Sequence, residues 1–413
     1  MFSVDSVWDL RVVRAKFGTE AIEEIGYDAK TFGGTRALIV TDKGVAKAGL
    51  LEMVKRPLER QEVKTEIWDE VEPEPSYDSL LKVIEFASNR NIDFFVGVGG
   101  GSSIDTAKIV NLITTHKGEI LDYVSAPIGK GKKIGGPCRP LVAVPTTAGT
   151  GSETSPAAIF SLPGQPLKYG IASDFMKPSL AILDPLMTLT VPSHVTASTG
   201  MDALSHAVES YVTWSYDTKL RSQIPTERPT YGGTTQLTDM FATKSIELIN
   251  NNLRIVVHRG NDVKARSDML LASFLAGVAF TNAGLGAVHA ASYPVGSRYH
   301  APHGVVCAIL LLAVMKYNMP SNYHKYAEIA KLLGEDTVGV TVREGAHLAL
   351  DALRTLMRDI GMPFGLSDLG AKEQDVPELA KDAMKVQRLL AGNPRPVTER
   401  DMQSILTDAL KNE

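Results

Sequence analysis

The sequence predicts an N-terminal α/β domain built on a parallel sheet, followed by an all-α C-terminal domain. In the first half, short apolar runs rich in β-branched residues alternate with helical stretches, which is typical of a parallel sheet covered by helices on both faces. After Asp184-Pro185 the strand runs stop and long helical patterns take over. Because 413 residues are too many for one ordinary core, we expect two domains, residues 1–190 and residues 191–413.

The expected elements follow in order along the chain. Runs of β-branched and aromatic residues predict four strands, at residues 36–42, 62–68, 93–98 and 140–144. Amphipathic patterns predict one helix at about 76–90 and another from about residue 103. In the second half, Pro192-Ser193 is a signal for a helix start. Residues 214–238 are rich in Thr, Pro, Gly and Ser and predict a loop inserted between helices.

Composition and charge limit the classes of partner. Hydrophobic residues make up 44% of the chain and charged residues 22%, the balance of an ordinary globular enzyme. The formal net charge is -4 and no basic cluster is present, so we expect a small-molecule partner rather than nucleic acid or anionic lipid. The longest apolar run, residues 305–315, is shorter than the roughly 18 to 20 residues that cross a bilayer, so we expect no membrane span.

The N-terminal sequence and the cysteines predict the compartment. The first ten residues have neither the basic region nor the continuous apolar region of a secretory signal. Cys138 and Cys307 are far apart in the sequence, so they offer neither a disulfide framework nor a cysteine-based zinc site. We therefore expect a cytoplasmic protein, and we expect it to form a homo-oligomer, with a dimer favoured.

A glycine-rich turn follows the predicted strand at 93–98. The turn is Gly99-Gly100-Gly101-Ser102, and a helix begins directly after it. Glycines at a strand-to-helix turn let backbone N–H groups approach a phosphate, and the helix dipole favours the negative charge. The turn departs from the Rossmann fingerprint, because Ser102 stands where the last glycine is expected. It predicts a pyrophosphate cradle, and the alternative is a tight turn before a buried helix.

Two further segments belong to the same predicted sheet edge. A polar loop with Thr146, Thr147 and Thr150 follows the strand at 140–144, and two such loops at strand ends favour a ligand crevice. Asp42, at the end of the first predicted strand, can accept hydrogen bonds from a ribose diol and would repel a 2'-phosphate. This pattern favours NAD over NADP. The alternative role for Asp42 is that of a helix N-cap.

Four residues in the second half form a candidate metal site. Asp202 and His206 lie four apart in a helical stretch and project from one face, although such a spacing arises about once by chance in this composition. His289 and His303 each stand near glycine or proline, where a turn can aim an imidazole. One carboxylate and three imidazoles suit Fe(II) or Zn(II) and leave a coordination position open for a substrate.

These motifs, taken together, resemble the iron-containing alcohol dehydrogenase family over nearly the whole chain. The resemblance rests on Gly99 to Ser102 with Asp105, on Pro145 to Thr150, on Gly200 to His206 and on Pro302-His303-Gly304. It implies an NAD-binding α/β domain, a helical metal-binding and catalytic domain, and iron as the metal, with zinc as the alternative. It also implies the metal ligands Asp202, His206, His289 and His303. The positions that it implies for cofactor contact are Asp42, Gly100, Gly101, Ser102, Asp105, Thr146, Thr147, Thr150 and Lys168.

Two departures from the family pattern are informative. Many members carry a histidine four residues after the third ligand, where this chain has Tyr293. Many also place asparagine between two prolines near the cofactor, where this chain has Glu74. With the inserted loop and the stretch at 121–131, these departures are most similar to the hydroxyacid-oxoacid transhydrogenase branch. That branch oxidises 4-hydroxybutyrate while reducing 2-oxoglutarate with retained NAD.

The resemblance implies hydride transfer between an alcohol or hydroxyacid and NAD(H), with the metal acting as a Lewis acid on the substrate oxygen. The transhydrogenase reaction is the first alternative. Tyr293 is a candidate proton relay, or else a packed aromatic residue with a structural hydroxyl contact. Arg298 or His300 could pair with a substrate carboxylate, or else be ordinary surface residues near a turn.

Two more remote alternatives come from other functional classes. An NAD- and metal-using lyase of the dehydroquinate synthase type would need several basic residues around a phosphate-bearing substrate, and the segments near His289 and His303 offer little beyond Arg298. A non-catalytic nucleotide-binding sensor would have no use for four metal ligands. The sequence therefore favours a metal-dependent oxidoreductase.

Overall fold

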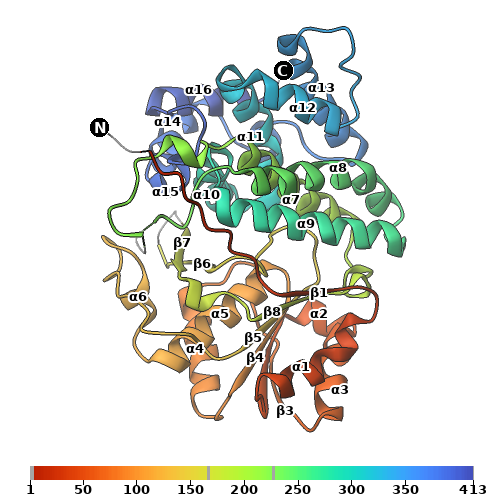
Figure 1. Ribbon diagram of the computed structural model, residues 1–413, viewed down its shortest axis with the longest axis vertical. Helices are drawn as coiled ribbons and strands as arrows, with labels where there is room; N and C mark the ends of the chain where they lie inside the picture. Colours follow the sequence, from red (N-terminus) through yellow and green to blue (C-terminus); the bar gives the residue numbers. More distant parts are fainter. Residues whose placement is uncertain (1–3, 165–167, 226–227, 413) are drawn as a thin grey trace. The chain divides into compact units, whose positions relative to one another are not determined.

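The computed structural model describes residues 4–164, 168–225 and 228–412 and divides into two compact units. One unit is Val12–Val191, and the other is the chain from Pro192 onward together with the N-terminal segment up to Arg11 (Figure 1). This segment was expected in the first domain, but its hydrogen bonds are made within the second unit. The Arg228 guanidinium donates to the Asp5 carboxylate (Nε to Oδ2, 2.8 Å), and the Arg11 N–H donates to Asn282 Oδ1 (2.7 Å).

The α/β unit is built on a six-stranded sheet in which every pair of neighbours is parallel, in the order β1-β8-β5-β4-β2-β3. A separate antiparallel pair is formed by β6 and β7. All four predicted strands are present, as β2, β3, β4 and β5. The strands are β1 (Ala15–Phe17), β2 (Arg36–Val40), β3 (Lys64–Trp68), β4 (Phe94–Gly99), β5 (Leu141–Pro145), β6 (Ala157–Ser161), β7 (Lys168–Ala172) and β8 (Leu180–Leu183).

Helices cover both faces of this sheet, as the alternating pattern predicts (Figure 1). In Figure 1, α4 and α5 lie on one side of the strands and α1 and α3 on the other. The helical elements of this unit are η1 (Ala21–Glu24), α1 (Ile25–Thr31), α2 (Lys43–Lys47), α3 (Leu50–Arg60), α4 (Tyr77–Ser88), α5 (Gly101–His116), α6 (Ile120–Tyr123), η2 (Asp174–Met176) and η3 (Pro185–Thr188).

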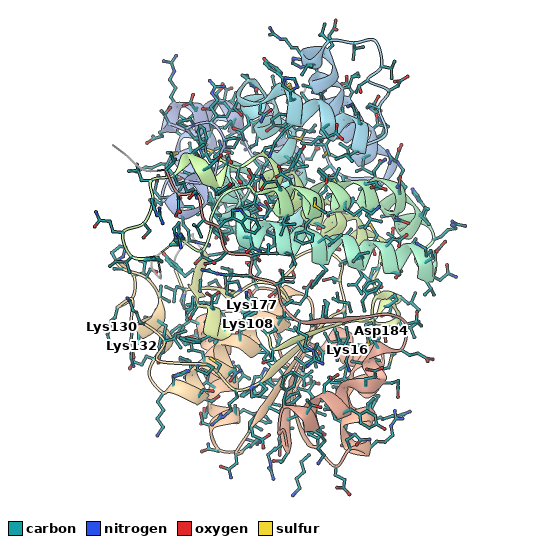
Figure 2. All side chains as sticks on the ribbon, in the orientation of Figure 1. Lys16, Lys108, Lys130, Lys132, Lys177 and Asp184 are labelled. Carbon is teal, nitrogen blue, oxygen red and sulfur yellow. The ribbon has the colours of Figure 1, made fainter. Side chains whose placement is uncertain are left out.

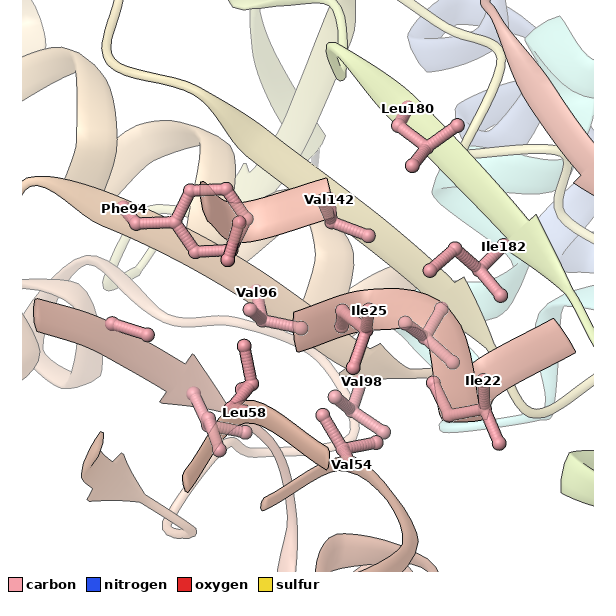
Figure 3. Packing of buried hydrophobic residues seen from close by; sticks show 14 of the residues in the cluster. Ile22, Ile25, Val54, Leu58, Phe94, Val96, Val98, Val142, Leu180 and Ile182 are labelled. Atoms are coloured by element: carbon pink, nitrogen blue, oxygen red, sulfur yellow. The ribbon is translucent and has the colours of Figure 1, made fainter. Parts of the chain in front are cut away.

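Alternation of side chains along the central strands divides the core into two layers. In β2, Ile39 packs with the residues of α1 and α3, whereas Leu38 and Val40 pack with those of α4 and α5. Figure 3 shows the first layer, in which Val96 of β4 lies among residues of the neighbouring strands and helices. Each fully buried aliphatic side chain contributes roughly 1.5–3 kcal/mol. The strands are therefore hydrophobic on both faces, which is why the sequence shows continuous apolar runs.

The second unit consists of helices, as predicted. A loop containing η4 separates α7 from α8 where the inserted loop was expected. The elements are α7 (Ser193–Val212), η4 (Tyr216–Thr218), α8 (Gln236–His258), α9 (Val263–Ala283), α10 (Ala287–Tyr299), α11 (His303–Asn318), η6 (Met319–Ser321), α12 (Tyr323–Leu332), α13 (Val342–Asp359), η7 (Leu366–Leu369), η8 (Glu373–Asp375), α14 (Val376–Ala383), α15 (Gln387–Leu390) and α16 (Glu399–Ala409).

Helix α11 is the most apolar of these helices and lies in the core of the helical unit. The stretch His303–Ser321 is long and apolar enough to cross a membrane by length and composition, and 72% of it is buried. Helices α9 and α10 pass the same test only as a pair bent by 107°. Burial of this kind is also typical of a core helix in a globular protein.

Candidate cofactor loop and metal centre

The glycine-rich turn joins β4 to α5 through a backbone conformation that only glycine adopts readily. Gly99 has a φ of +146°, and a Cβ at this position would lie 2.5 Å from Ser103 Oγ. A Cβ on Gly97 would lie 3.0 Å from the Cα of Ile104, so the strand and the helix are closely packed. Gly100 is the N-cap of α5. The turn therefore places the N-terminus of a 16-residue helix at the end of a central strand, the geometry that binds phosphate groups in dinucleotide folds.

The threonine loop after β5 lies directly against this turn. The N–H of Thr146 donates to the Gly99 carbonyl at 3.0 Å. Cβ atoms built on Gly100 and Gly101 would lie 3.5 Å from Thr147 Oγ1 and 3.1 Å from Thr150 Oγ1. The two polar loops that the sequence predicted at one sheet edge are therefore in contact, and the glycines leave the room for that contact.

Asp105 and Lys108 join helix α5 to the same threonine loop. Asp105 accepts hydrogen bonds from the Ser152 hydroxyl and from the N–H of Ile159 (2.9 Å). Lys108, only 1% exposed and labelled in Figure 2, donates to the carbonyls of Ser152 (2.8 Å) and Ala157 (2.7 Å). Burial lowers the pKa of the Lys108 ammonium. Asp105, which the family resemblance assigned to cofactor contact, thus has structural partners. The part played by Lys108 was not predicted.

Asp42 is a helix N-cap, one of the two roles that the sequence left open. Its Oδ1 accepts hydrogen bonds from the N–H groups of Gly44 (2.8 Å) and Val45 (3.0 Å), so Asp42 is the N-cap of α2. Its Oδ2 faces the glycine turn and would lie 3.5 Å from a Cβ on Gly99. Asp42 Oδ1 therefore caps helix α2, and Oδ2 lies beside the predicted pyrophosphate cradle.

Two other predicted cofactor residues have partners within the α/β unit. The Ser102 hydroxyl donates to the Pro73 carbonyl at 2.5 Å. Lys168, at the start of β7, forms an ion pair with Glu74 (Nζ to Oε1, 2.6 Å). Glu74 is the residue that departs from the family's asparagine, so this departure gives Lys168 a charged partner.

Helix α7 presents one polar face to the candidate metal centre. Asp202, His206 and Glu209 follow one another at spacings of four and three, which places all three on the same side of the helix. All three side chains are buried. His289 lies in the first turn of α10, and His303 is the first residue of α11. Three helices therefore supply the candidate ligands.

Two glycines allow these helices to approach closely. A Cβ on Gly304, directly after His303, would lie 2.1 Å from the Ser198 carbonyl oxygen of α7. A Cβ on Gly286, before α10, would lie 3.0 Å from Glu209 Oε1. Neither position has room for a larger residue. The glycines beside His289 and His303 therefore bring the starts of two helices against α7.

The donor atoms gather around one oxygen of Asp202. Asp202 Oδ1 lies 3.6 Å from His289 Nε2 and 3.7 Å from His303 Nε2. This carboxylate is 2% exposed, and Oδ1 accepts no hydrogen bond from the residues that the structure describes. Burial raises the pKa of the Asp202 carboxyl, but the imidazoles around it outweigh that effect and lower it overall. A buried carboxylate oxygen without a donor, facing two imidazole nitrogens, fits a divalent cation.

Cys307 belongs to this group of donors, although the sequence analysis expected no cysteine in a metal site. One ligand atom each from Asp202, His289, His303 and Cys307 lies within 4.8 Å of all the others. His206, a predicted ligand, lies close enough to Asp202 for its charge to lower the pKa of that carboxyl. Its ring stacks on the ring of His289, with centroids 4.5 Å apart and an interplanar angle of 18°. The missed signal was the position of Cys307 one helical turn after His303.

Glu209 orients His289 toward the other donors. Its Oε2 lies 2.5 Å from His289 Nδ1, and its Oε1 accepts the N–H of Val288 at 2.8 Å. The Nε2 atom of His289 is therefore directed toward Asp202. Carboxylates behind ligating imidazoles fix the tautomer and the ring orientation. The sequence analysis did not assign Glu209, although its spacing from Asp202 and His206 places it on the same helix face.

Tyr293 lies beside the donor group, with its ring centroid 6.3 Å from that of His303. Burial raises the pKa of the Tyr293 phenol, while the positive charges of Arg388 and His289 act in the opposite direction. Arg388 in α15 also donates from Nη1 to the Tyr231 hydroxyl at 2.8 Å. The sequence analysis did not single out Arg388, because nearly a hundred residues separate it from Tyr293.

Arg298 and His300, the predicted carboxylate-binding residues, lie at the end of α10. The Arg298 guanidinium forms ion pairs with Asp375 (2.9 Å) and Glu378 (2.5 Å). His300 is exposed and has a φ of +49°. Because two carboxylates already neutralise Arg298, its charge is less available to a substrate than that of Arg388.

A parallel α/β unit with a phosphate-type glycine turn and a helical unit with a largely buried group of nitrogen, oxygen and sulfur donors fit a metal-binding, nucleotide-dependent enzyme. The family model "Iron-containing alcohol dehydrogenase" matches residues 13–185, and "Fe-containing alcohol dehydrogenase family, C-terminal" matches residues 230–410. The chain belongs to the iron-containing alcohol dehydrogenase family and is an NAD-dependent oxidoreductase. The resemblance drawn from the motifs is thereby confirmed.

Relatives and solved structures match over almost the full length. The mitochondrial hydroxyacid-oxoacid transhydrogenase of Bos taurus is 34% identical, over 99% of this chain and 91% of its own. The 1,3-propanediol dehydrogenase of Citrobacter freundii is 38% identical, over 95% and 96%. A crystal structure of 1,3-propanediol oxidoreductase has a TM-score of 0.88 at 36% identity, over 98% of this chain and 100% of its own. An alcohol dehydrogenase from Oenococcus oeni has a TM-score of 0.89 at 34% identity, over 98% of this chain and 100% of its own.

The substitution Gly99→Ala tests the cofactor loop. The added Cβ meets Ser103 in a strained backbone conformation, which costs on the order of 1–3 kcal/mol, so the dissociation constant for NADH should rise about tenfold or more. NADH fluorescence titration measures this constant, and thermal melting checks the fold. Gly33→Ala is the matched control, because Gly33 also has a positive φ (+77°) but no described atom within 4 Å of its Cβ position. Equal losses in both variants would contradict the cradle.

The substitution Glu209→Ala tests the support of His289. Loss of the carboxylate frees the imidazole to rotate, and such losses typically weaken metal affinity 10–100-fold. Competition with a chromophoric chelator measures zinc affinity directly. Glu247→Ala removes a carboxylate of α8 that pairs with Lys244 on the surface and should leave the affinity unchanged. An unchanged affinity in Glu209→Ala would show that Glu209 only fills space.

Proposed function

We propose that this chain transfers a hydride between an alcohol or hydroxyacid and NAD(H) at a divalent ion held by Asp202, His206, His289 and His303. The observation that carries the proposal is the buried Asp202 Oδ1, which faces two imidazole nitrogens and accepts no hydrogen bond from a described residue. When bound, the ion supplies Lewis-acid chemistry to the substrate oxygen. Iron is the metal that the family name implies, and zinc suits the same donors.

The protein's own residues hold the cofactor and orient the donors. The turn from Gly99 to Gly101 and the threonine loop offer backbone N–H groups and hydroxyls to the pyrophosphate, and Asp42 Oδ2 offers an acceptor to a ribose hydroxyl. A carboxylate in that place repels a 2'-phosphate, which favours NAD over NADP. Glu209 holds His289 in the ligating orientation.

We assign proton transfer to Tyr293 and recognition of the substrate to Arg388. In this proposal the Tyr293 hydroxyl relays the alcohol proton to solvent, and the position of its ring beside that of His303 supports this role. Arg388 lies close enough to Tyr293 to act on its charge, and its guanidinium suits a bidentate carboxylate. We therefore assign the recognition of a hydroxyacid carboxylate to Arg388, ahead of Arg298 and His300.

The second candidate function is that of a hydroxyacid-oxoacid transhydrogenase, in which one bound NAD is reduced and reoxidised in turn. The full-length similarity to the relative of that name supports it. In this reading 4-hydroxybutyrate is the donor and 2-oxoglutarate the acceptor. Both are carboxylates, so the positive charge of Arg388 would serve both half-reactions.

We also propose a homo-oligomer, with a dimer favoured, located in the cytoplasm and without nucleic acid or membrane as partners. The moderate negative charge and the balanced composition support these proposals. The printed name of the bovine relative places that protein in mitochondria.

An activity screen separates the two candidate functions. Purified protein is incubated with 1,3-propanediol or 4-hydroxybutyrate, either with added NAD or with 2-oxoglutarate alone. NADH formation with added NAD is expected for a dehydrogenase, and oxidation of 4-hydroxybutyrate with 2-oxoglutarate and no added NAD for a transhydrogenase. Activity should be lost after treatment with a strong chelator and return with Fe(II) or Zn(II). Full activity in the metal-free protein would overturn the proposed function.

The substitution Arg388→Gln tests the carboxylate assignment. A hydrogen bond to a charged group contributes about 1.5–3 kcal/mol, so KM for hydroxyacids should rise roughly 10–100-fold while KM for neutral alcohols changes little. Arg298→Gln is the matched control and should leave both values unchanged. Equal effects of Arg388→Gln on the two substrate classes would contradict the assignment.

A further inference from the structure

Cys307 lies in α11, one turn after His303, and its side chain is fully buried. Its Sγ atom lies 3.6 Å from His303 Nε2 and 3.9 Å from His289 Nε2. These are the two imidazole nitrogens that also flank Asp202 Oδ1. Each of the two nitrogens is thus near both the carboxylate oxygen and the sulfur, and the four ligand atoms lie within 4.8 Å of one another.

The separations of these atoms match those of ligands on a single small ion. With metal–ligand bonds of about 2.0–2.3 Å, tetrahedral geometry separates a nitrogen from an oxygen by about 3.3 Å and from a sulfur by about 3.6 Å. The two nitrogen-to-oxygen distances are 3.6 and 3.7 Å, and the two nitrogen-to-sulfur distances are 3.6 and 3.9 Å. Movements of a few tenths of an ångström therefore convert this group into a coordination shell.

The surroundings of the sulfur differ from those of a cysteine that only fills space. A buried free cysteine ordinarily behaves as a small hydrophobic residue among apolar neighbours. Here the sulfur faces two imidazole nitrogens, and within 4.8 Å lies the Asp202 oxygen that no described residue satisfies. The unsatisfied oxygen is a second, independent indication that a cation occupies this place.

We propose that the Cys307 thiolate is a ligand of the ion, alongside Asp202, His289 and His303, and that it shifts metal preference toward zinc. The inference rests on the proposed function, because it concerns the same ion. On binding, the S–H proton passes to solvent and a sulfur–metal bond forms, since the thiolate is the ligating form. Thiolate donors are soft and favour Zn(II) over harder ions, whereas carboxylates and water do not. In this inference Cys307 takes the position that the proposed function gives to His206, and a substrate oxygen would enter as a fifth ligand.

X-ray absorption of zinc-loaded wild-type protein tests the proposal without any substitution. We expect one sulfur neighbour at about 2.3 Å in addition to nitrogen and oxygen neighbours at about 2.0–2.2 Å. A shell containing only nitrogen and oxygen would overturn the assignment of Cys307. The proposed metal site would nevertheless stand, so the two failures are distinguishable.

Cobalt substitution provides the second test, with a matched control within the chain. Co(II) bound to wild-type protein and to Cys138→Ser should show a near-ultraviolet sulfur-to-metal charge-transfer band, which Cys307→Ser and Cys307→Ala should lack. The two Cys307 variants should also bind zinc at least tenfold more weakly in chelator competition, and circular dichroism checks their folding. A band that persists without Cys307 overturns the inference. Wild-type protein that binds no Co(II) or Zn(II) overturns the proposed metal site as well.

Discussion

The close approach of α11 to α7 is the constraint on which the metal centre depends. At Gly304 the backbone of α11 meets the Ser198 carbonyl, and any side chain there would overlap it. The backbone of the preceding residue, His303, is thereby held close to α7. Without that contact Asp202 would be a buried carboxylate with fewer compensating charges, and such a group destabilises a fold unless it is paired. Gly304 is thus as necessary for the candidate metal centre as the neighbouring His303.

The donor residues differ in how far they depend on other residues for their orientation. His289 is held from behind by Glu209 and from the side by the stacked ring of His206. His303 and Cys307 share one helix and move together. Donors held by packed helices keep their arrangement without an ion, which would lower the cost of ordering the candidate site on binding.

Sequence reasoning succeeded where local patterns determine structure. The four predicted strands were located to within two residues, and in β2, β4 and β5 side chains buried on both faces produce the apolar runs that made this possible. The edge strand β3 was found although it is only partly buried, and the short buried strand β8 was not predicted. Strand β1 was missed since its three residues are mostly exposed and carry no such pattern. Asp202, His289 and His303 were found through motifs, and the structure brings them together. Cys307 and Arg388 were missed because their positions beside His303 and Tyr293 depend on helix packing. The ion pairs of Arg298 with Asp375 and Glu378 could not be predicted for the same reason, because these residues follow it by 77 and 80 positions in the sequence.

The buried ammonium of Lys108 has a consequence for the mechanics of the cofactor loops. It crosslinks α5 to the carbonyls of Ser152 and Ala157, while Asp105 beside it ties the same helix to β6. Breaking these hydrogen bonds would leave the Lys108 ammonium buried without partners, which is energetically costly. The glycine turn and the threonine loop should therefore move together as one rigid unit. If the proposed cradle binds NAD, it would therefore be formed before the cofactor arrives. Exchange of the cofactor would then need no local unfolding of the two loops.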